Sequence, residues 1–159
     1  MLNPRKAFNF RISFPNQPTL PVFACQTVTI PDETVEQIEH GTGNSRIKTA
    51  GQYIAGEATI GMIIPASKAI VSPDLNPNNF FRNWQRSAQD PILGGGSDPF
   101  FYKRTTLVEE LANDGATVLN SYLLVGAWPT KINGREYSRT ESNNVVETVE
   151  LSTDAIPYI

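Results

Sequence analysis

The residues best suited to catalysis are the single cysteine and the single histidine, Cys25 and His40. A thiol beside an imidazole can act as a nucleophile, because the imidazole takes up the thiol proton. However, Cys25 lies in the alternating segment "VFACQTVTI", which predicts a strand, and His40 precedes a polar segment. We therefore interpret both as structural residues. With one histidine, no metal site that needs two can form within one subunit.

A run of carboxylates precedes the histidine in "DETVEQIEH". On a helix, Glu36 and His40 would lie one turn apart and could share a metal ion. The run follows Pro31 and contains β-branched residues, which favours a strand. On a strand these two side chains would lie far apart. We therefore expect a solvated or interface strand and predict no metal site.

Two further groups of residues suggest chemistry but lack the geometry for it. Glu147 and Glu150 occur in "VVETVEL", and their odd spacing places them on opposite faces of a strand. This excludes a matched general acid and base. The segment "LGGGS" has no Lys-Ser or Lys-Thr after it, as a phosphate-binding P-loop would. The sequence therefore predicts no catalytic residue, no cofactor and no metal.

The composition indicates a single β-rich domain covering residues 1–159. Charged residues make up 18% of the chain, which also contains 11 glycines and 12 prolines, as expected for many turns. The net charge of −3 without a basic cluster argues against tight nucleic-acid binding. No apolar run has the length of a membrane span or the form of a signal peptide. We expect a protein made and used in a reducing cytoplasm.

Alternation of apolar and polar residues predicts most of the chain to be strands. In "FNFRISF", for example, Ile12 and Phe14 share the apolar face. The Asp114-Gly115 pair predicts a hairpin turn. The strand after it is apolar on both faces, as a strand covered on both sides would be, and we expect Pro129 to end it at a sheet edge. The predicted strands are 8–14, 22–30, 34–40, 56–65, 102–111, 116–128 and 145–152.

One helix and one long arm complete the prediction. Residues 77–89 are predicted to form a helix, with Asn76 as N-cap and Phe80, Phe81 and Trp84 on its apolar side. Residues 41–52 are polar and small, and we expect a long loop or an extended hairpin arm. Segments of this length without a core of their own are often functional.

Several segments in order resemble the tail tube protein family of contractile bacteriophages, which also includes inner tubes of related injection particles. A strand ending in Ala-Trp-Pro is followed by a lysine, a glycine, a polar loop and a strand with two spaced glutamates. "NFRISF", "VEQIEHGTGNSRIKTAGQY", "GEATIGM" and "FFRNWQ" occur in the expected places. The extensions around 66–79 and 89–103 are longer than the family pattern. The matching positions in the C-terminal segment are Ala127, Trp128, Pro129, Lys131, Gly134, Glu147, Glu150 and Leu151.

The resemblance implies a mainly β fold, a two-sheet β-sandwich or barrel with one short helix. It implies a non-enzymatic subunit that forms hexameric rings, stacked through the loop at 41–52 into a phage tail tube that conducts DNA. The alternatives are an inner tube of an injection or secretion system that carries protein, or a baseplate tube-initiator ring. The implied partners are further copies of itself, sheath, tape-measure and baseplate proteins and passing DNA, without membrane insertion. The implied location is the virion tail, assembled in the host cytoplasm.

Two groups of residues are predicted to make the assembly contacts. The first group lies in and before the long arm and is expected at the interface between rings. The second group is expected between subunits of a ring or facing the lumen. The inter-ring residues are Glu36, Glu39, His40, Asn44, Arg46, Lys48 and Gln52. The inter-subunit or lumen residues are Arg135, Arg139, Glu147 and Glu150.

Overall fold

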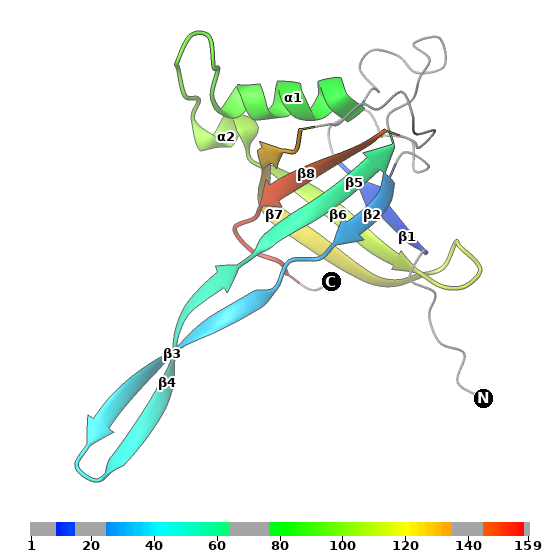
Figure 1. Cartoon of the computed structure of the whole chain (residues 1–159). Helices are drawn as coiled ribbons and strands as arrows, with labels where there is room; N and C mark the ends of the chain where they lie inside the picture. Colours follow the sequence, from blue (N-terminus) through cyan, green and yellow to red (C-terminus); the bar gives the residue numbers. More distant parts are fainter. Residues whose placement is uncertain (1–8, 15–24, 64–76, 135–144, 158–159) are drawn as a thin grey trace, which may run out of the picture.

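The computed structural model describes residues 9–14, 25–63, 77–134 and 145–157. Within these residues the chain is mainly β, as predicted, with two short helices (Figure 1). The elements are β1 (Phe10–Ser13), β2 (Cys25–Thr29), β3 (Glu33–Thr42), β4 (Ser45–Ala55), β5 (Glu57–Ile63), α1 (Pro77–Ala88), α2 (Pro99–Tyr102), β6 (Arg104–Leu111), β7 (Val118–Ile132) and β8 (Val146–Ser152).

Six strands form one antiparallel sheet in the order β1-β6-β7-β8-β5-β2, and β3 and β4 form a separate hairpin. Strand β7 belongs to both halves of the large sheet. Its first part pairs with β6, and its last residues, from Trp128 onward, pair with β8. The two halves cross each other, and their inner faces enclose the core (Figure 1). The core therefore draws on both halves of the sheet and on helix α1.

The alternation read from the sequence places the core side chains correctly. In β5, Ala58, Ile60 and Met62 are buried, and in β8 Val149 and Leu151 are buried, while the side chains between them are partly exposed. The predicted hairpin at Asp114-Gly115 joins β6 and β7. These predictions are confirmed because one face of each strand meets an apolar interior.

The predicted helix is present as α1, and its apolar side covers one end of the core. Phe80, Phe81 and Trp84 are buried and contact Phe14, with ring centroids 5.3 to 5.9 Å apart. Tilted and edge-on ring pairs of this kind stabilise a core beyond the area that they bury. The Trp84 indole Nε1 donates a hydrogen bond of 2.6 Å to the Tyr102 carbonyl, which ties α1 to α2.

Two predictions about β7 are wrong. Pro129 does not end the strand, which continues to Ile132 with a register shift just after the proline. Such a bulge lets a residue without an N–H group stay inside a sheet. The strand is also not covered on both sides by its own chain, since Val118, Leu119 and Val125 are exposed.

The prediction of a single helix is also wrong, because residues 99–102 form α2 and β6 begins only at Arg104. Asp98 accepts a hydrogen bond of 2.9 Å from the Phe100 amide, and Pro99 occupies the first turn. These are standard signals of a helix start. Neither helix of the described part of the chain has the length and apolarity needed to cross a bilayer.

Candidate assembly surfaces

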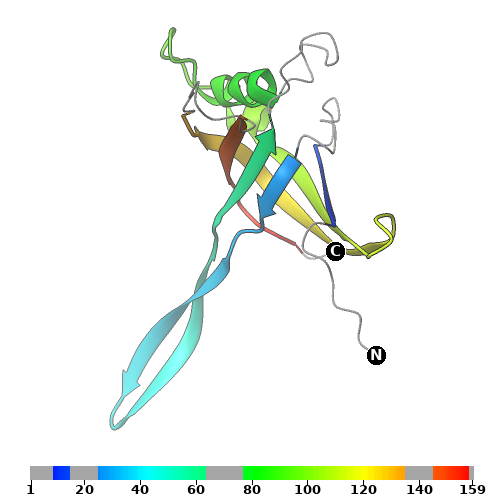
Figure 2. The same ribbon diagram turned by 45° about the vertical axis from the view of Figure 1, so that its right-hand side comes forward.

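The segment predicted as a long loop or arm is an antiparallel hairpin, the β3–β4 arm (residues 33–55). It projects away from the rest of the molecule and narrows to a turn (Figures 1 and 2). Gly43 occupies this turn with φ +59°, a conformation that suits glycine. Nearly all of the arm's described side chains are exposed in the single chain. The arm therefore has no partner of its own to pack against.

The tip of the arm has two different faces. Ile38 pairs with Thr49 and His40 pairs with Ile47, so these four side chains share one face. The His40 Nε2 lies 3.1 Å from the Thr49 hydroxyl, in agreement with this register. This face, formed by Ile38, His40, Ile47 and Thr49, is the apolar face of the arm tip.

The other face of the tip is charged. One Glu39 carboxylate oxygen lies 3.5 Å from the Arg46 guanidinium, and the other lies 3.6 Å from the Lys48 ammonium. All three side chains are substantially exposed, so each ion pair adds little stability. These charges already have partners within their own hairpin.

The structure brings the whole first group of predicted site residues together on the arm. Each of them is exposed, and the strand interpretation of "DETVEQIEH" is confirmed by β3. Their role between rings stays a prediction. The residues are Glu36, Glu39, His40, Asn44, Arg46, Lys48 and Gln52.

The second predicted group is not brought together. Arg135 and Arg139 lie outside the described residues. Glu147 and Glu150 do face opposite sides of β8, as predicted. However, Glu147 has 0% exposure, so a lumen or inter-subunit position for it is wrong: its own chain already covers it completely. Glu150 is partly exposed, and its carboxylate lies 3.4 Å from the Lys131 ammonium.

The chemistry of the described residues gives no sign of a catalytic site. Burial raises the pKa of the Cys25 thiol to about 11, which leaves almost no thiolate at neutral pH. The Cys25 thiol donates a hydrogen bond to the Thr27 carbonyl at 3.6 Å. The His40 imidazole lies on the β3–β4 arm and contacts the Thr49 hydroxyl there. Across the described ranges, no three metal-binding side chains cluster.

Sequence reasoning missed a second exposed apolar surface, in the extension at 89–103. Ile92 and Leu93 are 87% and 83% exposed, and Phe100 and Phe101 are 86% and 68% exposed. We term these four residues, two in the loop after α1 and two in α2, the rear patch. The sequence does contain a signal for this surface. Two pairs of consecutive apolar residues, "IL" and "FF", occur in a segment rich in Pro, Gly and Asp. Large exposed apolar side chains of this kind make the rear patch a candidate interaction surface.

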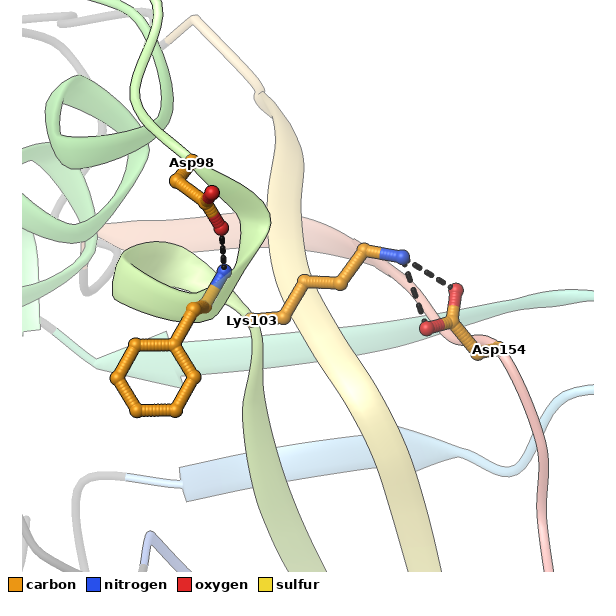
Figure 3. A network of polar contacts seen from close by, with 4 residues as sticks. Asp98, Lys103 and Asp154 are labelled. Carbon is orange, nitrogen blue, oxygen red and sulfur yellow. Dashed lines mark hydrogen bonds and ion pairs between the residues drawn. The ribbon is translucent and has the colours of Figure 1, made fainter.

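Polar contacts hold the elements next to the rear patch (Figure 3). Asp98 caps α2, and the Lys103 ammonium contacts both carboxylate oxygens of Asp154 at 2.8 Å. The backbone amide of Asp154 donates to the Val125 carbonyl, so the C-terminal segment runs along β7. Gly126 leaves room for the Asp154 carboxylate, which a side chain at this position would strike. The contacts join α2, β7 and the C-terminal segment.

Comparison with known proteins identifies the family. A family model described as "T4-like virus tail tube protein gp19" matches residues 6–156. The chain belongs to the T4-like virus tail tube protein gp19 family. The predicted resemblance is therefore confirmed. Because this is a family of structural proteins, the prediction that the chain is not an enzyme is confirmed as well.

Curated relatives within the gp19 family come from two phages. "Tail tube protein gp19" of Enterobacteria phage T4 is 29% identical over 138 residues, which cover 86% of this chain and 78% of that protein. The protein of the same name from Enterobacteria phage T6 matches equally well. The chain is thus a tube subunit of a T4-like phage tail or of a contractile injection particle.

Solved structures share the fold of this gp19 family member at low identity. The cap of the anti-feeding prophage has a TM-score of 0.76 and 18% identity, with 100% of this chain and 93% of that chain covered. A chain of the PVC extracellular contractile injection system, from its sheath–tube complex in the extended state, has a TM-score of 0.72 and 17% identity, with 98% of this chain and 91% of that chain covered. Hcp1 from Flavobacterium johnsoniae has a TM-score of 0.55 and 13% identity, with 95% of this chain and 94% of that chain covered.

Proposed function

We propose that this chain is the structural subunit of a phage tail inner tube, in which hexameric rings stack and enclose a lumen that conducts DNA. The observation that carries the proposal is the β3–β4 arm. It extends away from the body and leaves apolar side chains, such as Ile38 and Ile47, exposed in the single chain. An arm of this kind gains burial only when another molecule covers it.

Contacts between rings would use the arm in a head-to-tail manner. In a head-to-tail contact, one surface of a subunit meets a different surface of the next copy, so the contact repeats without closing. Repetition along the tube axis then gives a filament of rings. The residues predicted at this interface are exposed on the arm and available for the contact.

Contacts within a ring would use the edges of the large sheet. Strands β1 and β2 are its two outermost strands, so each has one side without a strand partner in the described chain. An open edge invites pairing with another chain. Pairing edges between neighbouring subunits would satisfy these backbone groups, and a closed ring would limit growth to a fixed number of copies.

The charge of the chain fits the passage of DNA without binding. Its net charge is −3, and a lumen with few cations offers phosphates little attraction. Sheath, tape-measure and baseplate proteins are the expected partners in the virion tail. The phage relatives, at 29% identity, favour this reading over protein cargo.

Negative-stain electron microscopy of the purified full chain tests the proposal. We expect rings at low concentration and stacked tubes at high concentration, with matching species in analytical ultracentrifugation. A preparation that stays monomeric at high concentration would refute it. The alternatives give different results: an injection-system tube would bind protein cargo in its lumen, and a tube-initiator would form single rings that do not extend.

A further inference from the structure

The rear patch, formed by Ile92, Leu93, Phe100 and Phe101, lies at the opposite end of the molecule from the arm tip. In both views, α1, α2 and the loop between them stand at one end, and the tip of the β3–β4 arm stands at the other (Figures 1 and 2). The molecule therefore has an exposed apolar surface at each end. This is the arrangement that a head-to-tail contact requires.

The rear patch is a built surface whose side chains are held outward. A carboxylate oxygen of Asp90 accepts hydrogen bonds from the amides of Ile92, at 2.7 Å, and Leu93, at 3.2 Å. These bonds also lower the pKa of Asp90. Residues Gln89 and Gly96 form a β-bridge that closes the base of the loop. The loop that carries these apolar side chains is therefore already ordered, so little further conformational entropy is lost when a partner binds.

Phe100 and Phe101 are held in a comparable way. Asp98 caps the amide of Phe100 at 2.9 Å, and the two rings pack edge to face with centroids 5.7 Å apart. Clusters of preorganised aromatic side chains are typical of the residues that dominate binding energy at protein interfaces.

The charges at the two ends are complementary. The extension at 89–103 carries two carboxylates, Asp90 and Asp98, and one lysine, Lys103, which pairs with Asp154. Arg86 lies close enough to Asp90 to offset part of this charge. The arm tip carries Arg46 and Lys48 against the single carboxylate of Glu39. Opposite net charges at the two ends steer their approach. The contact itself would be made by the apolar face, because Arg46 and Lys48 lie on the other face of the tip.

We propose that the rear patch of one subunit receives the apolar face of the arm tip from a subunit in the adjacent ring. The inference rests on the proposed function, because it names the surface that accepts the arm when rings stack. Ile38 and Ile47 of the arm would pack on Phe100 and Leu93. The partner is thus a second copy of this chain, and the extension at 89–103 supplies its contact surface.

Disulfide trapping tests the contact directly. In a Cys25→Ser background, the full chain with Ile47→Cys and Leu93→Cys is assembled into tubes and oxidised with copper phenanthroline. A disulfide needs Cα atoms within about 7 Å, so it reports true proximity. We expect a ladder of dimers, trimers and longer chains on a non-reducing denaturing gel, since each subunit carries both halves of a head-to-tail contact.

Matched variants control the trapping experiment. Ile47→Cys alone and Leu93→Cys alone should give no ladder. Ile47→Cys with Val118→Cys, another exposed apolar position, should give none either. Dimers without longer species would indicate a symmetric contact and overturn the proposal. The absence of any cross-link in well-formed tubes would also overturn it.

A second measurement uses surface variants that leave the core intact. Ile92→Ser with Phe100→Ser should form rings but at least tenfold fewer stacked tubes, counted by electron microscopy. Val146→Ser, which removes an exposed side chain elsewhere, should form tubes normally. Normal tubes from the double variant would overturn the proposal, and loss of sheath binding by those tubes would assign the patch to the sheath. If the unmodified chain forms neither rings nor tubes, the proposed function itself fails.

Discussion

The six-stranded body and the β3–β4 arm are both antiparallel sheet, but they differ in what covers their side chains. In the body, inward residues such as Ile60, Leu124 and Val149 have 0% exposure. On the arm, every described position between strand ends is exposed or only half-buried. The same backbone pattern therefore serves two purposes. The body is stabilised by its own core, whereas the side chains of the arm stay exposed in the single chain and are covered only if another molecule binds them.

The largest effect on folding should come from the aromatic cluster of the body. Phe81 has 0% exposure and contacts Phe14, Phe80 and Trp84. Phe81→Ala removes this packing and leaves a cavity, so the free energy of unfolding should fall by about 3–5 kcal/mol. Urea denaturation followed by tryptophan fluorescence measures the change.

A matched aromatic outside the core provides the control. Phe101 is largely exposed, so Phe101→Ala should change the free energy of unfolding by less than about 0.5 kcal/mol. Equal effects at Phe81 and Phe101 would contradict the distinction between a self-stabilised core and surfaces that need a partner.

A smaller effect is expected where β7 passes the C-terminal segment. Gly126 has φ +67°, and a Cβ there would collide with the Asp154 carboxylate. Gly126→Ala should therefore lower the free energy of unfolding by about 1–3 kcal/mol, through backbone strain and displacement of Asp154. Thermal denaturation followed by circular dichroism measures the loss.

Another glycine separates these two causes. Gly115 has φ +74° but open space around a Cβ. Gly115→Ala therefore reports backbone strain alone, and it should be less destabilising than Gly126→Ala. If the two variants are equally destabilised, the close approach of Asp154 contributes nothing.

Periodicity in the sequence predicted the body well because alternation reports directly which face meets the core. It predicted β5, β8 and the apolar side of α1. The buried position of Glu147 was also accessible, since Glu147 shares its parity with Val149 and Leu151. The apolar neighbours at i+2 and i+4 point inward, and this parity contradicts the predicted inter-subunit or lumen position of Glu147.

Features set by contacts distant in sequence could not be predicted. The bulge beside Pro129 depends on where β7 changes partner from β6 to β8. In sequence, Val118 and Val125 look like residues of a strand covered on both sides, yet both are exposed, because residue type alone does not say whether an apolar side chain is buried. The sequence of the arm did not predict how its two strands pair, because strand register is set by alternating apolar residues and the tip contains few of them.

Variants of the arm should separate folding from assembly. Ile38→Ser with Ile47→Ser alters two exposed residues, so the free energy of unfolding should change by less than about 0.5 kcal/mol. The same variant should lose stacked tubes if assembly covers this face. Urea denaturation at a concentration that yields unassembled chains and electron microscopy at high concentration give the two readings. A large fall in the free energy of unfolding would contradict this, because it would mean that the arm side chains stabilise the folded single chain.

The smallest effect should come from the β6–β7 turn, and it should be lost in acid. Hydrogen bonds from the Thr117 hydroxyl and from the amides of Ala116 and Thr117 lower the pKa of Asp114 from 3.8 to about 2. Because the folded pKa is depressed, the stabilisation is present above about pH 4 and is lost as the pH falls toward 2.

Denaturation midpoints of the unmodified chain and of Asp114→Ala, measured from pH 7 to pH 2, test this dependence. The difference between them should be constant at neutral pH and should shrink below pH 4, because protonation then removes in the unmodified chain the interaction that the variant lacks throughout. Asp98→Ala is the matched control, since it also loses a carboxylate that caps an amide. A difference between the unmodified chain and Asp114→Ala that persists unchanged to pH 2 would mean that the turn is stabilised by its backbone shape rather than by the charged carboxylate.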